Sequence, residues 1–448
     1  MTVTESSPTA IARESVPERP WRRAFAWLCF LTPFFYLTYG AANWLASLRP
    51  GVPSIVFGWE HAIPFLGWTI IPYWSINVFY GLSLFVCATR DELDTHGRRL
   101  LTAQVVAVIC FILLPLRFTF TQPETVGLPG FLFAALTSFD QPFNQAPSLH
   151  IALLVILWVL YARHLPRWAL YLLHPWFALV GASVLTTYQH HFIDVPTGAL
   201  LGLFCLWLWP DRGPTPISVF ALTRDPQRRR LAIRYAAGAL VFAGAALLTG
   251  RAGWWLFWPA LALVFVAANY AVFGAAGFQK GADGRMSLAV RLLLAPYLAG
   301  AWINSRIWTR NEPTQAAVDD GVAIGRMPSR GDSGAFASIV DLSAEMPALH
   351  AHDGWHAYPT LDLVAPPPST LREAAATIER ARARGAVLVC CALGYSRSAS
   401  AVAVWLLVTG RASSIQDAVE RVRRVRPRIV LGADALQAIE HAARGNTP

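Results

Sequence analysis

A cysteine and an arginine are separated by five residues near the carboxyl end of the chain. The segment Cys391–Arg397 contains Gly394 and follows the apolar run 386–389, which is typical of a buried strand. A glycine-containing loop between a strand and a helix turns backbone N–H groups inward, and the helix N-terminus adds partial positive charge. Arg397 could then bind two phosphoryl oxygens. The same field favours the thiolate of Cys391, which is the nucleophilic form.

The Cys-x5-Arg spacing followed by Ser398 resembles the signature of the cysteine-dependent protein tyrosine and dual-specificity phosphatases. The resemblance covers about residues 318–446 and implies a soluble α/β domain. It implies that Cys391 is the nucleophile, that Arg397 holds the phosphate, and that Ser398 eases departure of the thiolate. The phosphate-binding residues that it implies within the loop are Gly394 and Ser396.

The same resemblance implies an upstream aspartate that protonates the leaving oxygen. Asp362 is the best match, and Asp353 is the alternative. One position departs from the family pattern, because Cys390 stands where histidine usually precedes the nucleophile. Two adjacent thiols could also be sensitive to oxidation. The alternative to catalysis is a phosphatase fold that binds phosphate without turning it over.

Most of the chain before residue 305 has the composition of a membrane protein. Hydrophobic residues make up 55% of the chain and charged residues only 14%. Apolar stretches that are long enough to cross about 30 Å of hydrocarbon predict about eight membrane spans. The predicted architecture of this region is a multi-pass, all-α helical bundle. These stretches are residues 24–47, 63–87, 100–116, 148–162, 168–188, 195–210, 232–249 and 254–274.

Basic residues gather in alternate loops, which predicts one cytoplasmic side that includes the amino terminus. The net charge of +10 is therefore attributed to topology and lipid contact, and no nucleic-acid partner is expected. The segment 286–317 is predicted to be an interfacial helix and linker, with a ninth span over 286–304 as the alternative. The expected order is a disordered tail (1–20), a first membrane domain (21–215), two further spans (216–285), this linker, and a phosphatase domain (318–448).

Two histidines and an aspartate are predicted to meet at the opposite face of the membrane. His150 begins the fourth stretch, whereas His190 and Asp194 follow the fifth. Ionisable groups at a hydrocarbon boundary are costly and usually functional. Two imidazoles and a carboxylate are the components for covalent phosphoryl transfer, with one histidine as nucleophile and one as acid. A helix cap and an interfacial anchor are the structural alternatives.

These residues resemble the type 2 phosphatidic acid phosphatase superfamily, especially its inositol-phosphorylceramide-synthase-like branch, over about residues 100–210. The resemblance implies that His190 attacks phosphorus, that Asp194 orients it, and that His150 protonates the leaving group. Val184 stands where the family has an arginine, and the Lys-x6-Arg-Pro motif is poorly met. The phosphate ligands that the resemblance implies are Arg117, Gln122 and Ser148.

The complete order resembles a bacterial family that fuses a phosphatidic-acid-phosphatase-like membrane domain to a dual-specificity phosphatase domain. The resemblance implies a multi-pass inner-membrane protein with a periplasmic histidine site and a cytoplasmic cysteine site. The expected partners are membrane lipids and a phosphorylated lipid or protein substrate, and no cofactor or metal is expected. A headgroup transferase and a non-catalytic lipid phosphate sensor are the alternatives. The oligomeric state is left open.

Overall fold

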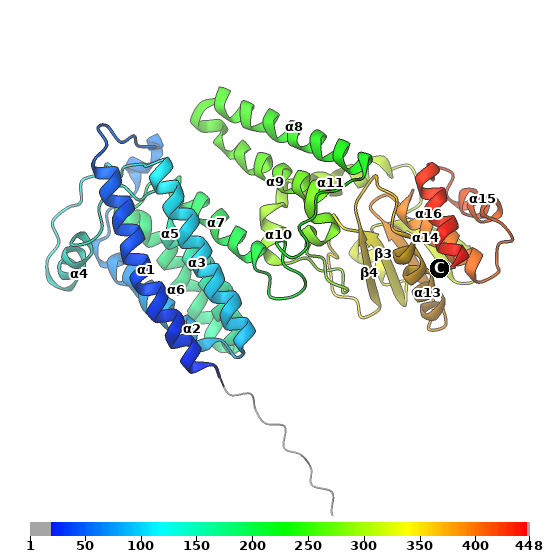
Figure 1. Cartoon of the computed structure of the whole chain (residues 1–448), viewed down its shortest axis with the longest axis horizontal. Coiled ribbons are helices and arrows are strands. Elements are labelled where there is room, and N and C mark those ends of the chain that lie inside the picture. Colours follow the sequence, from blue (N-terminus) through cyan, green and yellow to red (C-terminus); the bar gives the residue numbers. More distant parts are fainter. Residues whose placement is uncertain (1–18, 446–448) are drawn as a thin grey trace, which may run out of the picture. The chain divides into compact units, whose positions relative to one another are not determined.

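A computed structural model describes residues 19–445 (Figure 1). The chain divides into two compact units, Met1–Cys205 and Leu206–Pro448. Most of the predicted disordered tail, residues 1–18, lies outside the described residues. The two units are therefore described in turn, from residue 19 onwards.

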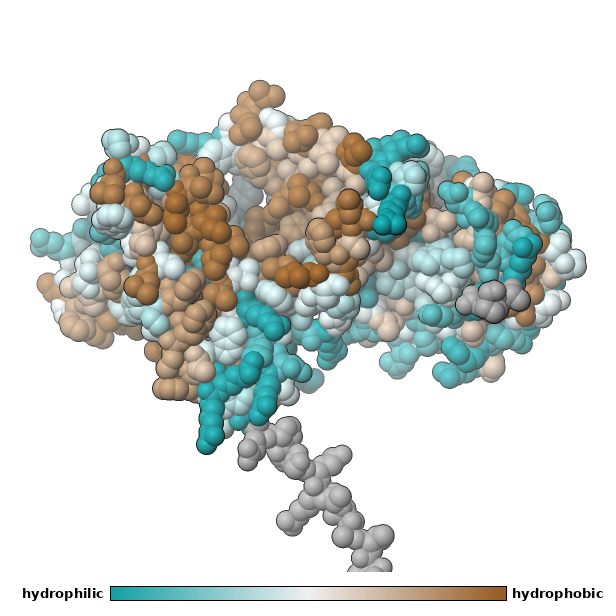
Figure 2. Space-filling model, in the orientation of Figure 1, coloured by the Kyte–Doolittle hydropathy of each residue, from teal (hydrophilic) through white to brown (hydrophobic). Residues whose placement is uncertain are grey.

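The first unit is helical. Its core is formed by apolar side chains between α1, α3 and α5, such as Phe111 and Leu100, and by a second cluster around Phe177 and Leu157 on α6 and α5. Large apolar side chains also face outward, as in a protein solvated by lipid (Figure 2). The helices are α1 Trp21–Ser47, α2 Ile70–Val86, α3 Arg90–Leu113, α4 Gly127–Thr137, α5 Leu149–His164, α6 Arg167–Thr186 and α7 Asp194–Leu208.

All eight predicted spans coincide with helices, and six helices within residues 19–445 are long and apolar enough to cross a membrane. The other two, α5 and α7, are apolar but contain only 16 and 15 residues. Helix α3 begins at Arg90, ten residues earlier than the predicted stretch 100–116. It does so because the Thr89 side chain accepts the Glu92 N–H and two acidic residues occupy the first turn.

The second unit begins with a helical pair. Helix α8 (Pro226–Leu248) is capped by the Asp225 carboxylate and has proline at its first position. The chain then returns through α9 (Phe257–Ala268), which continues in irregular helical turns to Phe278. The predicted interfacial segment forms two short helices, α10 (Leu288–Leu293) and α11 (Ala295–Trp308). Neither is among the helices of membrane-spanning length in the described part of the chain.

A five-stranded sheet follows, in the order β1-β2-β5-β3-β4. Strands β2, β5, β3 and β4 are parallel, and β1 is antiparallel to β2. All residues of β5 are buried, as expected for a central parallel strand. The strands are β1 Gln315–Asp319, β2 Val322–Arg326, β3 Ser338–Ser343, β4 Trp355–Thr360 and β5 Val387–Cys391.

Helices cover the face of the sheet that carries Val389 and Cys391, where they pack around the buried Trp405. The opposite face carries Leu388 and Cys390 and packs on Met327, Met346 and Trp355. Parallel strands place their carboxyl ends, and the loops that follow them, at one edge of the sheet. The expected α/β domain is confirmed. Its helices are α12 Arg330–Ser333, α13 Pro368–Arg382, α14 Arg397–Val408, α15 Ile415–Val425 and α16 Ala433–Arg444.

The only lysine of the chain joins the helical pair to the sheet. Lys280 follows α9, and its side chain is completely buried in an ion pair with Asp341 of β3. Its ammonium also donates to the carbonyl oxygens of Ser343 and Met346, at 2.7 and 2.6 Å. An ammonium has three hydrogens, so these contacts satisfy all of them. The segment after α9 is therefore part of the packed structure of the α/β domain.

Lys280→Met should destabilise the second unit, because Asp341 would stay buried without its counterion. Removing one partner of a buried pair costs about 3–5 kcal/mol. Hydrogen exchange of the β3 and β5 amides, measured on the full chain in detergent micelles, should accelerate accordingly. Arg285→Met removes an exposed cation from the same segment. It should change the free energy of opening that governs exchange by less than about 0.5 kcal/mol. Equal exchange in the two variants would contradict this role for Lys280.

Candidate active sites

The loop from Cys391 to Arg397 connects the end of β5 to the first residue of α14. The Cys391 sulfur lies 3.3 Å from the Gly394 nitrogen, which donates to it, and 3.3 Å from the Ser398 hydroxyl oxygen. Gly394 has a φ of 77°, and a Cβ there would lie 2.5 Å from the Gly325 carbonyl oxygen. Glycine is therefore required at this turn. Ser396 occupies the N-cap position of α14.

Arg397 is buried and surrounded by acceptors. Its Nη1 donates to Glu345 Oε2 and to the Thr360 carbonyl oxygen, both at 2.8 Å. Its Nη2 donates to Glu345 Oε1 at 2.6 Å and to Asp362 Oδ1 at 2.8 Å. These four bonds use all four Nη hydrogens of the guanidinium. A phosphate that binds Nε and Nη2 together must therefore displace Asp362 from Nη2.

The pKa values of the two carboxylates around Arg397 are shifted in opposite directions. Burial raises the pKa of Asp362 above its usual value, and nearby Glu345 adds to this, although Arg397 opposes it. Burial also disfavours the charge of Glu345, but the bidentate contact with Arg397 outweighs it and lowers the pKa of Glu345. Environments that separate two carboxyl pKa values assign different roles to them. The charged form of Glu345 is thus favoured beside Arg397, whereas Asp362 is more easily protonated than an ordinary aspartate.

The three strand ends explain why these residues meet. Glu345 follows β3, Asp362 follows β4, and Cys391 ends β5. All three therefore lie at the carboxyl edge of the sheet. Asp353, the alternative acid, precedes β4 and so belongs to the opposite edge. The sequence-based prediction missed Glu345, which lies two residues after the end of β3.

Cys390 is not oriented like Cys391. Successive residues of a strand face opposite sides of the sheet, and the two cysteines belong to different hydrophobic clusters. Cys390 is fully buried, and this burial raises the pKa of its thiol well above the usual value. Both cysteines are free thiols. Cys390 thus acts as a small core residue in this structure.

Two of the three groups that the sequence singles out in the first unit, His190 and Asp194, are in contact. His190 Nδ1 lies 3.1 Å from Asp194 Oδ2, and its Nε2 lies 3.2 Å from the Ser148 hydroxyl. Ser148 also caps α5 by accepting the Ile151 N–H. The carboxylate holds one ring nitrogen, so the other ring nitrogen is directed toward Ser148.

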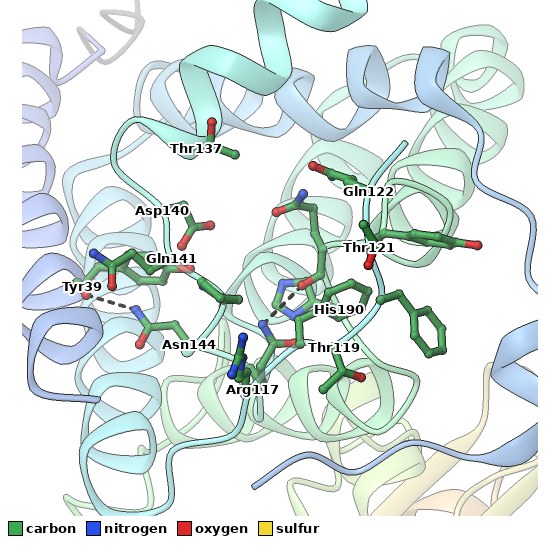
Figure 3. Close-up of a pocket in the computed structure, with 16 residues that line it drawn as sticks. Tyr39, Arg117, Thr119, Thr121, Gln122, Thr137, Asp140, Gln141, Asn144 and His190 are labelled. Carbon is green, nitrogen blue, oxygen red and sulfur yellow. Dashed lines mark hydrogen bonds between the residues drawn. The ribbon is translucent and has the colours of Figure 1, made fainter. Parts of the chain in front are cut away.

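His190 lines a cavity of about 540 Å³ together with Arg117 and Gln122 (Figure 3). The lining is largely polar and includes Asp140 and Asn144, which the sequence-based prediction did not single out. Gln122 donates to the Thr187 carbonyl oxygen at 2.7 Å. Ser148, the third predicted phosphate ligand, is in contact with His190 itself. Two of the predicted phosphate ligands thus line the same cavity as the predicted nucleophile, and the third contacts that histidine.

His150 lines a second, smaller cavity that His190 also borders. Its ring stacks on Tyr73 with centroids 4.2 Å apart, and its Nε2 is buried without a hydrogen-bond partner. A buried polar atom without a partner is uncommon and calls for an explanation. The second cavity is lined mostly by apolar and aromatic side chains, including Phe35, Leu136 and Leu153. The two cavities therefore meet at His190 but differ in polarity.

His191 is held by other groups. Its Nδ1 lies 3.0 Å from Glu60 Oε2, and its Nε2 accepts the Thr119 N–H at 3.2 Å. Both ring nitrogens are thus engaged away from Asp194. Glu60 was not predicted, because it lies far from His191 in the sequence. Within residues 19–445, no three His, Cys, Asp or Glu side chains are grouped so that they could hold a metal ion.

Comparison with known proteins bears on the second unit. The family described as "Dual specificity phosphatase, catalytic domain" matches residues 337–442. Similar solved structures are Tk-PTP in the active form (27% identity, 30% of this chain, 97% of that chain, TM-score 0.27) and human DUSP28 (22%, 30%, 95%, 0.27). PTPMT1 in complex with PI(5)P is also similar (16%, 30%, 96%, 0.26). No curated protein matches the chain.

The family match includes Glu345, Asp362 and the whole loop from Cys391 to Arg397. It begins just before β3. Residues 337–442 of this chain are a dual-specificity phosphatase catalytic domain, and they follow a helical region that contains several apolar helices.

Proposed function

We propose that the chain is a membrane-bound phosphatase in which Cys391 hydrolyses phosphomonoesters by covalent catalysis. The supporting observation is that Cys391, Arg397 and Asp362 meet at one edge of the sheet, with the Gly394 N–H directed at the sulfur. The Cys391 thiolate attacks phosphorus, and the bond from phosphorus to the ester oxygen breaks as Asp362 transfers its proton to that oxygen. Water then attacks the thiophosphate, Asp362 accepts a proton from this water, and the thiolate departs beside Ser398.

Phosphate binding and acid catalysis are linked in this mechanism through Arg397. The incoming phosphate takes the Nη2 hydrogen that Asp362 accepts in the free protein. Asp362 loses its cationic partner at that moment, which favours its protonated form. Glu345 keeps its two bonds to Arg397 and holds the guanidinium in place.

Asp362→Asn should lower kcat for alkyl phosphomonoesters by about 10²–10⁴-fold, the usual size of general-acid catalysis. Because Asp362 acts in its protonated form, kcat of the native protein should fall as the pH rises through its raised pKa. In the Asp362→Asn variant, kcat should no longer fall at alkaline pH. Steady-state kinetics across pH measure both effects.

Asp353→Asn is the matched control for this variant, and we expect its rate to stay within about twofold of the native protein because Asp353 is at the opposite edge of the sheet. A large loss in Asp353→Asn with a normal alkaline limb in Asp362→Asn would assign the acid to Asp353 and refute the scheme.

We further propose that His190 transfers a phosphoryl group from a lipid phosphate at the opposite membrane face. His190 would attack phosphorus, Asp194 would orient the ring and stabilise its positive charge, and His150 would protonate the leaving oxygen. The arrangement of His190 between Asp194 and a cavity containing Arg117 supports this role. In hydrolysis, water would then release phosphate from His190.

Transfer to a lipid alcohol is the second candidate for this site, and the smaller cavity favours it. This cavity is mostly apolar and borders both His150 and His190. A lipid alcohol could therefore reach His190 from the apolar side while the phosphorylated donor occupies the polar side. Hydrolysis needs apolar access for the lipid phosphate alone, whereas transfer needs it for the lipid acceptor as well.

His190→Ala should abolish the reaction of lipid phosphates in detergent. This holds whether the native protein releases phosphate from them or transfers their phosphorylated group to an acceptor. Cys391→Ser should leave that outer-site reaction intact and should abolish hydrolysis of soluble aryl phosphates. Mass analysis of the lipids, with and without a diacylglycerol acceptor, separates hydrolysis from transfer. His174→Ala, which alters a histidine outside both cavities, is the control. Loss of the same activity in both active-site variants would show that the sites are not independent.

The proposed location is the bacterial inner membrane, with the amino terminus and the phosphatase domain in the cytoplasm and the His190 site facing the periplasm. The proposal is supported by the basic loops of the sequence and by the apolar helices. A reporter that is active only in the cytoplasm should be active when it is fused after Pro448, and a reporter that is active only in the periplasm should be inactive there. A periplasmic signal from this fusion would reverse the orientation.

A further inference from the structure

The general-acid segment of the phosphatase domain is attached to the ends of two membrane-length helices. The Tyr270 hydroxyl donates to the Asp362 carbonyl oxygen at 2.9 Å, and the Gln227 amide contacts the Leu363 carbonyl oxygen at 3.4 Å. Gln227 is in the first turn of the candidate span Pro226–Leu248, and Tyr270 is in the last part of the candidate span Gly250–Phe278. The ends of spans lie at the boundary between hydrocarbon and water. Asp362 is therefore held at this boundary.

The phosphate-binding loop is attached on another side to α11. The Ser305 hydroxyl donates to the Ala392 carbonyl oxygen at 2.5 Å, and the Tyr395 hydroxyl contacts the Trp308 carbonyl oxygen at 3.3 Å. Arg306 adds a bond to the Met327 carbonyl oxygen at 3.0 Å. Both the nucleophile loop and the acid segment are thus fixed to helices outside the matched phosphatase region.

The outer face of α11 has the composition of a helix that lies on a membrane. Large apolar side chains on it are between 41% and 61% exposed: Trp302, Ile303, Ile307 and Trp308. The Arg306 guanidinium lies 5.0 Å from the centroid of the Trp302 ring. Tryptophan and arginine beside an apolar face are typical of helices at the headgroup level. A water-soluble domain rarely exposes such a patch.

Lipid is the occupant that the surrounding structure favours for this face. The same compact unit contains two candidate spans, α8 and the segment Gly250–Phe278 that includes α9, and α11 packs against α9. The outward side chains of α8 are also apolar and about 70% exposed, including Ile233, Leu240 and Val241. The hydrophobic surface in Figure 2 covers this helical part of the unit. Because the outer face of α11 continues the apolar surface of these two spans, the bilayer around the spans also covers this face.

We infer that the substrate of Cys391 is a phosphomonoester carried on the headgroup of a membrane lipid. This inference rests on the proposed function of Cys391 and specifies its substrate class. The acid and the nucleophile are each held beside a helix that contacts lipid, so the pocket meets phosphates at headgroup depth. Basic residues at these helix ends, among them Arg228 and Arg310, attract anionic lipids to the same place.

The test compares two substrates with the same leaving-group chemistry. The full chain with His190→Ala is reconstituted into phosphatidylcholine liposomes, so that only the cysteine site is active. One substrate is 4-dodecylphenyl phosphate, which is anchored in the same bilayer, and the other is 4-ethylphenyl phosphate in solution. We expect kcat/KM for the anchored substrate to be at least about tenfold higher, because the bilayer raises its effective concentration at the pocket.

The double variant Ile303→Glu/Ile307→Glu should lower this ratio by about tenfold, because two charges on the outer face of α11 oppose contact with the hydrocarbon. Val408→Glu is the matched control, since Val408 is 46% exposed at the far end of α14. It should leave the ratio unchanged.

A ratio near one in the His190→Ala protein without the α11 substitutions would overturn the lipid assignment while leaving the phosphatase intact. A kcat/KM for a phosphotyrosyl peptide above that for the anchored substrate would do the same. If neither aryl phosphate is hydrolysed, the proposed function of Cys391 fails instead.

Discussion

The ion pair between Arg397 and its two carboxylates is the interaction on which the phosphatase site depends. A buried guanidinium is tolerable only if its donors are satisfied and its charge is neutralised. Glu345 does this permanently through two bonds, while Asp362 occupies one remaining hydrogen. In the proposed mechanism, the free protein therefore keeps the acid on the same nitrogen that phosphate needs. Substrate binding would then exchange one anion for another and leave no new buried charge without a partner.

The positions of these groups follow from the order of the parallel strands. Because β3, β4 and β5 run in the same direction, the residues that follow them converge at one edge. Residues that precede the matched region 337–442 add further contacts to this domain. Lys280 neutralises Asp341 under the sheet, Ser305 holds the phosphate loop, and Tyr270 holds the acid segment. The catalytic domain is thus structurally continuous with the helices that precede it.

Local patterns made much of the architecture predictable. The Cys391–Arg397 loop, the strand before it and the helices after it depend on short-range sequence, and the structure places them as expected. The helices near the eight apolar stretches were also predictable, although α5 and α7 are shorter than a typical span. His190, Asp194 and Ser148 were identified through motif spacing, and the structure brings them into contact.

Long-range partners were not predictable in this way. Glu345 meets Arg397 across 52 residues, and Lys280 meets Asp341 across 61 residues. Nothing in the neighbourhood of either residue indicates its partner, because tertiary packing alone brings them together. Glu60 and Asp140 were missed in the first unit for the same reason.

The central claim is that Cys391 attacks phosphorus while Arg397 holds the phosphate. Acid quenching of the full chain during turnover of an aryl phosphate, followed by mass analysis of its peptides, tests this most directly. The account predicts a transient phosphoryl group on the peptide that contains Cys391. Turnover of the aryl phosphate without any phosphorylated cysteine, or with phosphate only on His190, would contradict it.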